Sequence, residues 1–130
     1  MIRIILNATL LDNQFTGIGN YQWNVIEHLS KEKDINLHVV INNAFSSSKL
    51  GQQLKAKVKS VNPEVVFVNA SKNKLNYRIK SLLGKYTKKG YIYHDLAFNS
   101  ALGKVAKAKI VTFHDAFFLD KKLWPSKFGF

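Results

Sequence analysis

The sequence predicts an α/β fold with a doubly wound, mainly parallel sheet made of βαβ units. Short apolar runs typical of buried strands alternate along the chain with longer segments that carry apolar residues at helical spacing. The first run, residues 2–6, is continuously apolar apart from one arginine, as expected of a strand covered on both faces. The length of 130 residues suits one compact domain, which we expect to span residues 1–130.

The first half of the chain contains three predicted strands and two predicted helices. Strands are expected over residues 2–6, 35–41 and 64–68, and helices from about 19 to 31 and from the serines at 46–48 to Asn62-Pro63. Either Thr16 or Asn20 is expected to cap the first helix. The expected apolar stripes of the two helices are Tyr21, Val25, Ile26 and Leu29, and Leu50, Leu54, Val58 and Val61.

The second half repeats the alternation. A helix is predicted over residues 72–89, a strand over 91–93, a short helix over 100–107 and a strand over 109–113. Such an alternation of strands and helices favours parallel strands joined by right-handed crossovers.

Composition excludes several classes of protein. The chain has no cysteine, which rules out disulfides and cysteine metal sites. No apolar run approaches the roughly 18 residues that span a bilayer, and the N-terminus lacks the apolar core of a signal peptide. We therefore expect a cytoplasmic protein, peripheral at the inner membrane face if it meets a membrane.

Positive charge is concentrated in the middle of the chain. The formal net charge is +12, and residues 49–90 hold eleven basic residues against one acid, Glu64. Such a field attracts nucleic acid, anionic lipid or phosphorylated ligands, although a solvated lysine-rich face gives the same pattern. The predicted contacts to a membrane or polyanion are Lys74, Arg78, Lys80, Lys85, Lys88 and Lys89.

A glycine-bearing turn follows the first predicted strand. It comprises Thr16, Gly17, Ile18, Gly19 and Asn20, and it leads into the first predicted helix. It lacks the third glycine of a dinucleotide fingerprint and the Gly-Lys-Ser/Thr of a P-loop. The free N–H groups of a helix N-terminus favour a bound anion, whereas the plain structural alternative is a tight turn that needs glycine dihedrals.

Two histidine–aspartate pairs end the later predicted strands. His94-Asp95 follows residues 91–93, and His114-Asp115 follows the run that ends at Phe113. At a strand's carboxyl end a histidine can hydrogen-bond a sugar hydroxyl or serve in acid–base chemistry, or it can simply bond the backbone. The four side chains together offer a hard metal site, but their spacing matches no compact metal signature, so we predict no metal.

These motifs together resemble a known family. A strand, a Thr-Gly-Ile-Gly-x-Tyr turn and a later Ile-Val-Thr-Phe-His-Asp run are similar to the N-terminal, acceptor-side domain of retaining glycosyltransferases of the GT-B fold, family 4 or group 1. The resemblance implies a Rossmann-like half in which the glycine turn (Thr16 to Asn20) lines the substrate edge. His94 is expected to bind substrate at the same edge because it ends a neighbouring predicted strand, although His94-Asp95 is not part of the family's pattern. The resemblance implies that His114 contacts the transferred sugar near the reacting centre. We expect His114 and Asp115 to be the catalytic pair, with Asp115 either orienting the imidazole or capping the next loop.

The same resemblance implies the reaction and its partners. A glycosyl unit would pass from a nucleotide-sugar, the co-substrate, to a hydroxyl of a sugar or lipid-linked acceptor, with no cofactor and no required metal. Asn20 stands where the family commonly has arginine, and the family's C-terminal nucleotide-sugar domain has no counterpart in these residues. We therefore expect this chain alone to bind donor weakly and to turn over little or nothing, with the missing half supplied by a further domain or partner chain. The alternative function is a small basic nucleic-acid-binding module without catalysis.

Overall fold

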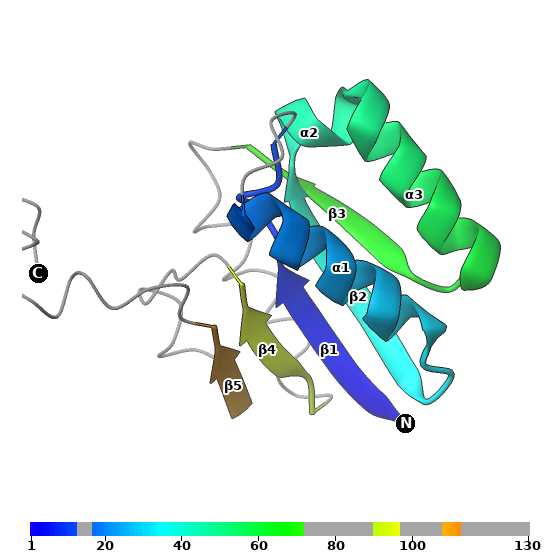
Figure 1. Ribbon diagram of the computed structural model, residues 1–130. Coiled ribbons are helices and arrows are strands. Elements are labelled where there is room, and N and C mark those ends of the chain that lie inside the picture. Colours follow the sequence, from blue (N-terminus) through cyan, green and yellow to red (C-terminus); the bar gives the residue numbers. More distant parts are fainter. Residues whose placement is uncertain (13–16, 72–89, 97–107, 113–130) are drawn as a thin grey trace, which may run out of the picture.

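The computed structural model describes residues 1–12, 17–71, 90–96 and 108–112, which form one sheet with helices packed on it (Figure 1). All pairings among the described strands are parallel, and the strand order is β3-β2-β1-β4-β5. The chain thus winds outward from β1 in both directions, which confirms the predicted α/β class and the parallel, Rossmann-like sheet. The strands are β1 (Ile2–Asn7), β2 (Ile35–Asn42), β3 (Val66–Ala70), β4 (Ile92–Asp95) and β5 (Ala108–Val111).

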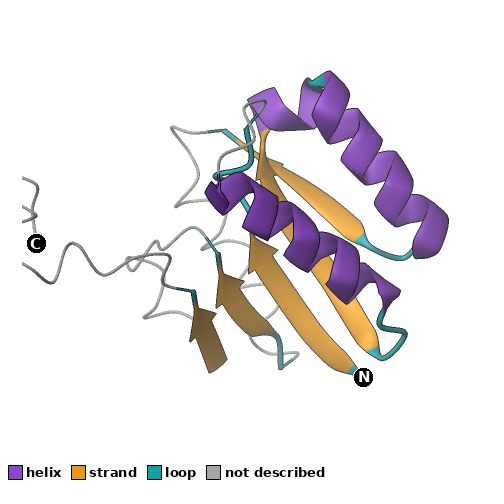
Figure 2. Ribbon diagram, in the orientation of Figure 1, coloured by secondary structure: helices purple, strands orange, loops and turns teal. Residues whose placement is uncertain are grey.

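The described helices lie on one face of the sheet (Figure 2). Helix α1 (Gly17–Lys31) connects β1 to β2, and α2 (Asn43–Ser47) with α3 (Lys49–Val61) connects β2 to β3. Both connections step in the same direction along the sheet, and crossovers of one hand therefore place both on the same face. None of the described helices is long and apolar enough to cross a bilayer.

The core lies between these helices and the sheet. Alternate residues of the central strands, such as Leu6 and Val39, pack against Ile26 of α1 and Leu54 of α3. The other strand residues face the opposite side of the sheet, and these too are buried at Ile5 and Tyr93. Burial on both faces explains why the central strands are continuous apolar runs.

The apolar stripe predicted for α1 is partly wrong. The buried residues of α1 are Gly19, Gln22, Ile26 and Ser30. Val25 and Leu29 only flank the core, and Tyr21 is 38% exposed. Two of these buried residues are polar and are satisfied by carbonyl groups: Gln22 bonds the Leu96 carbonyl at the end of the sheet, and Ser30 bonds the Glu27 carbonyl of its own helix. Asn20 lies within the first turn of α1 and is therefore not its N-cap, whereas Thr16 lies outside the described residues.

The capping prediction for the second helix is confirmed at one serine. The Ser48 hydroxyl accepts a hydrogen bond from the Gly51 backbone N–H at 3.0 Å, which begins α3, and Asn62 ends it. The preceding serines instead belong to the short helix α2, which the sequence analysis missed. The cap of α2 is Asn42, whose side chain accepts from the Phe45 backbone N–H. Val61, predicted in the apolar stripe, is 52% exposed at the end of α3.

Most strand boundaries differ from the predicted ones by one or two residues, and the differences at β3 and β4 matter most for the site. Strand β3 begins at Val66 because residues 63–64 form a turn after α3. Strand β4 extends to Asp95, so His94 and Asp95 are its last two residues rather than the loop beyond it. The predicted helices over 72–89 and 100–107 lie outside the described residues, as does Phe113 of the predicted strand 109–113, whereas Thr112 is described and lies just beyond β5.

Candidate functional site

The carboxyl ends of β1 and β4 lie side by side at the point where the strand order reverses. Asn7 pairs with Asp95 in the register, although the two residues are far apart in sequence. After β1 the chain leads to α1 and β2 on one side, while β4 and β5 lie on the other. Parallel α/β sheets bind ligands outside the strand ends at such a switch point.

A buried hydrogen-bond network joins the two strand ends on the face opposite the helices. The Asn7 amide donates to the Tyr93 hydroxyl at 3.0 Å and to Asp95 Oδ1 at 3.1 Å. The Thr9 hydroxyl donates to Asn7 Oδ1 at 2.8 Å. Burial and the nearby Asp95 carboxylate raise the pKa of Tyr93 well above its usual range, so its phenol stays protonated. Asn7 therefore ties β1, β4 and the loop after β1 together.

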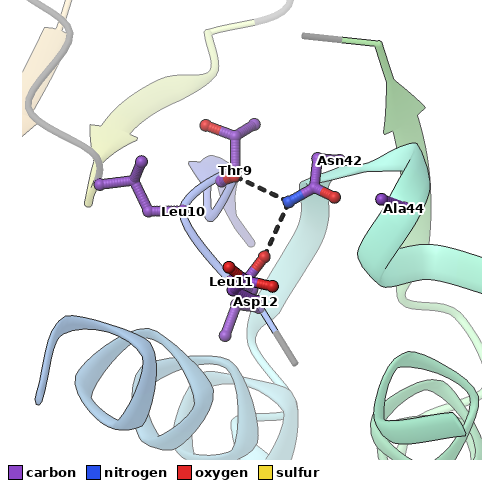
Figure 3. Close-up of a pocket in the computed structure, with 6 residues that line it drawn as sticks. All are labelled: Thr9, Leu10, Leu11, Asp12, Asn42 and Ala44. Atoms are coloured by element: carbon purple, nitrogen blue, oxygen red, sulfur yellow. Dashed lines mark hydrogen bonds between the residues drawn. The ribbon is translucent and has the colours of Figure 1, made fainter. Parts of the chain in front are cut away.

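A hollow of about 150 Å³ opens beside this network, between the ends of β1 and β2 (Figure 3). The Asn42 amide stands at its wall and donates to the carbonyls of Thr9, at 2.9 Å, and Leu11, at 2.7 Å. These two bonds fix the loop after β1 against the end of β2. Leu10, at the rim of the hollow, is 48% exposed. The lining residues are Thr9, Leu10, Leu11, Asp12, Asn42 and Ala44.

Helix α1 begins with a glycine that its own geometry does not require. The φ of Gly17 lies outside the left-handed region, and a Cβ placed on it would meet nothing within 4 Å. The dihedral explanation for a glycine therefore does not hold at Gly17 in this structure. Because Gly17 is exposed and has no side chain, an outside group can approach its backbone closely at the start of α1.

Gln22 carries a buried acceptor at the same edge. Its Nε2 donates to the carbonyl of Leu96, the residue directly after β4, at 3.0 Å. Because a carbonyl accepts only from a donor, this bond orients the amide and leaves Oε1 as the other end. Gln22 is fully buried, and among the described residues its Oε1 finds no hydrogen-bond partner. An unmet buried acceptor is costly and suits a ligand group that donates.

His94, Thr112 and Tyr21 are linked on the helix-facing side of β4 and β5. Thr112 Oγ1 lies 3.2 Å from His94 Nε2 and 3.3 Å from the Tyr21 hydroxyl. Burial lowers the pKa of His94, against a smaller opposite effect of the Asp95 carboxylate. The imidazole is therefore biased toward its neutral form, which can donate or accept at Nε2.

The structure brings part of the predicted site to one edge. Gly17, Ile18, Gly19 and Asn20 form the first turn of α1, and Tyr21 of the next turn reaches Thr112, which adjoins His94. The remaining predicted site residues lie outside the described part of the chain: Thr16, His114, Asp115 and the basic residues Lys74, Arg78, Lys80, Lys85, Lys88 and Lys89.

Sequence reasoning missed the residues that organise the edge, namely Asn7, Thr9, Gln22 and Thr112. A signal was available for two of them. Asn7 and Thr112 are the first polar residues after apolar strand runs, the position at which His94 attracted attention. Gln22 carries no local signal, because its significance depends on the Leu96 carbonyl 74 residues away in sequence.

The basic residues of α3 are largely engaged within the fold. Lys57 Nζ lies 2.6 Å from Glu27 Oε1, and this hydrogen bond is the main reason why the pKa of Glu27 is lowered. Lys55 donates to the Ser46 hydroxyl and Lys59 to the Pro63 carbonyl. Among the described residues, no group of three histidine, aspartate or glutamate side chains is placed to hold a metal ion.

Comparison with known proteins finds no matching protein-family model, no matching curated protein and no matching solved structure. The function is therefore proposed from the sequence and the geometry of the edge.

Proposed function

We propose that this chain is the N-terminal, acceptor-binding half of a glycosyltransferase that moves a sugar from a nucleotide-sugar to an acceptor hydroxyl. The observation that carries the proposal is the set of polar side chains at the carboxyl ends of the strands, where the strand order reverses. There the N-terminal half of α1 meets the carboxyl ends of β4 and β5 through Gln22 and Tyr21. Polar side chains that converge at this place in a parallel sheet are what a hydroxyl-rich ligand needs.

Each part of the edge has a role in this proposal. The open start of α1 at Gly17 admits a phosphate oxygen of the donor to backbone N–H groups and to the positive end of the helix. The buried Gln22 Oε1 accepts a hydrogen bond from a ligand hydroxyl. The wall made by Thr9 and Asn42 shapes the acceptor side of the hollow.

The resemblance adds His114 as a residue near the reacting centre, and Asp115 is its neighbour in sequence. They follow Thr112, which already lies beside Tyr21 of α1. In this proposal, His114 contacts the transferred sugar, and a second domain binds the nucleotide. The lysine-rich segment 72–89 would hold the enzyme near an anionic membrane that carries a lipid-linked acceptor.

The test is ligand binding by the 130-residue chain, followed by two-dimensional NMR of the backbone amides. UDP-glucose and GDP-mannose serve as donor probes, and n-octyl β-D-glucoside below its micelle concentration serves as the acceptor probe. We expect weak, saturable shifts confined to the first turn of α1, residues 8–12 and the ends of β4 and β5.

Gly17→Ala is the decisive variant, because it separates stability from binding. Alanine fits the open space and has the better helix propensity, so the variant is expected to be as stable as wild type or up to about 1 kcal/mol more stable. Its added methyl blocks the close approach and weakens donor binding several-fold. The matched control Asn24→Ala, exposed on the same helix, leaves binding unchanged.

Unchanged donor binding in Gly17→Ala would contradict the role of the helix start. Absence of any saturable binding by wild type would overturn the proposed function. Binding of a mixed-sequence oligonucleotide that falls steeply with added salt, in place of sugar binding, would instead support the nucleic-acid-binding alternative.

A further inference from the structure

Strand β5 forms an open edge of the sheet. It lies last in the strand order, beside β4, and no described strand pairs with its other side (Figure 1). Ala108, Lys109 and Ile110 are exposed, Ile110 to 48%, and Val111 is half-buried. At the opposite edge of the sheet, by contrast, Phe67 of β3 packs against the core. Natural proteins seldom leave an apolar strand edge uncovered, because its backbone groups can pair with another chain.

The backbone groups on the open side of β5 belong to Lys109 and Val111. The Thr112 N–H donates to the Asp95 carbonyl of β4 at 3.0 Å. In a parallel strand the N–H and C=O groups of one residue point to the same neighbouring strand, and those of the next residue point the opposite way. Thr112 and, two residues earlier, Ile110 therefore face β4. Lys109 and Val111 direct their N–H and C=O groups away from the sheet.

This edge is complementary to a second copy of itself in one antiparallel register. Two copies related by a two-fold axis perpendicular to the sheet place residues of the same face opposite each other. If Ile110 faces Ile110 of the second copy, each Lys109 faces a Val111, and both of these pairs exchange their N–H···O hydrogen bonds. The registers that pair Lys109 or Val111 with itself form only one such pair within β5, and the first of them also sets like charges opposite each other.

We propose that β5 is a dimer interface at which two copies of this chain join edge to edge in this register, so that their sheets become one. Ile110, the exposed large apolar side chain of β5, then packs against its counterpart at a pair without hydrogen bonds, where side chains lie closest. Stable interfaces bury about 1,200–2,000 Å². An edge of 4 residues covers less, so the association is weak and depends on concentration. This inference goes beyond the proposed function and does not depend on it.

The net charge determines how the association responds to salt. Each chain carries a formal charge of +12, so two copies repel each other, and added salt screens this repulsion. The dimer fraction is therefore expected to rise between about 50 and about 200 mM NaCl. Docking of an acidic strand from a different protein would respond in the opposite direction, because salt would screen an attraction.

The first experiment measures the dimer fraction of the 130-residue chain by sedimentation velocity, from about 20 µM to about 1 mM protein. Lys109→Pro removes an N–H group that points away from β4, so the pairing of β4 with β5 is kept. Ile110→Thr removes the apolar contact. We expect each variant to weaken the association several-fold, whereas the matched control Lys109→Ala keeps the N–H group and should associate at least as well as wild type. Circular dichroism checks the fold of each variant.

The second experiment tests the register by disulfide formation, because the chain has no cysteine of its own. Ile110→Cys places two thiols opposite each other across the interface, and we expect a disulfide-linked dimer under air oxidation. In the matched control Lys109→Cys, each thiol faces Val111 of the second copy. This control should cross-link at least about five-fold more slowly, since its two thiols are too far apart for a disulfide. Gel electrophoresis without reductant measures both rates.

Three outcomes would overturn the proposal. A wild type that stays monomeric over the whole concentration range would leave this edge to a strand from a different protein. Association that persists unchanged in both Lys109→Pro and Ile110→Thr, or that falls with added salt, would place the contact elsewhere. Equal rates of cross-linking for Ile110→Cys and Lys109→Cys would refute the register. Binding of the nucleotide-sugars and of the glucoside is measured separately, so failure of the dimer leaves the proposed function standing.

Discussion

Replacing Asn7 by aspartate tests the buried network most sharply. The two side chains have nearly the same shape, but the change puts a carboxylate oxygen where the amide donates to Asp95 Oδ1 at 3.1 Å. Asn7 is fully buried and Asp95 is 1% exposed, so water cannot separate the two charges. The variant must either hold two adjacent carboxylates or take up a proton.

The expected loss of stability equals the smaller of two free-energy costs, namely charge repulsion and protonation. Two charges about 3 Å apart repel by about 5 kcal/mol at an effective dielectric constant of ~20. Protonating one carboxyl whose ordinary pKa is near 4 costs about 4 kcal/mol at pH 7, and the shared proton restores a hydrogen bond. We therefore expect Asn7→Asp to lose about 4 kcal/mol of unfolding free energy at pH 7, a large part of the stability of a small domain.

The sign of the pH dependence is fixed by the shared proton. The folded variant holds one carboxyl with a raised pKa, so it binds a proton that the unfolded chain releases above pH 4. Its deficit relative to wild type should shrink by about 1.4 kcal/mol for each pH unit between 7 and about 4.

Urea unfolding followed by circular dichroism at pH 7, 5.5 and 4.5 measures this deficit. Asn43→Asp, an exposed change of the same kind, is the control and should track wild type at each pH. A variant as stable as wild type at pH 7, or a deficit that does not change with pH, would refute the contact between residues 7 and 95.

Two further predictions concern packing and His94. Gly51→Ala should lose about 1–3 kcal/mol of unfolding free energy despite the better helix propensity of alanine, because the added Cβ overlaps the Phe45 carbonyl of α2. Urea unfolding measures this loss, with the exposed change Gln52→Ala as the control. Equal stability of the two variants would contradict the close packing of α2 on α3. The lowered pKa of His94 means that the unfolded chain takes up its proton first. As the pH falls from 6.5 through the lower folded pKa, wild type should therefore lose stability that His94→Gln does not lose. Parallel stability–pH curves for the two proteins would rule out this burial effect.

Much of the fold was predictable because its signals are local. The continuous apolar runs at residues 2–6 and 35–41 indicate strands wherever they pack, and both are confirmed as β1 and β2. Ser48 and Asn62 mark the ends of α3 through bonds to neighbours in sequence, so capping rules are sufficient to place them. The parallel sheet then follows from the alternation of the elements.

The buried face of α1 was not predictable from its period. Tyr21 is the first residue of the predicted apolar stripe, but it is partly exposed and its hydroxyl contacts Thr112, whereas the neighbouring Gln22 is buried. A polar side chain becomes a core residue only when a distant group satisfies it, here the Leu96 carbonyl. Helical spacing contains no information about that partner.

The sequence by itself determined that this chain alternates strands and helices, is strongly basic and carries polar residues where apolar strand runs end. Only the tertiary structure decided which of these polar residues meet. Asn7 with Asp95, and His94 with Thr112 and Tyr21, are neighbours because the strand order reverses at β1, which places β4 beside β1 and β5 beside β4. Hydrogen bonds act over about 3 Å, so their partners are set by the strand order and register and not by separation along the chain.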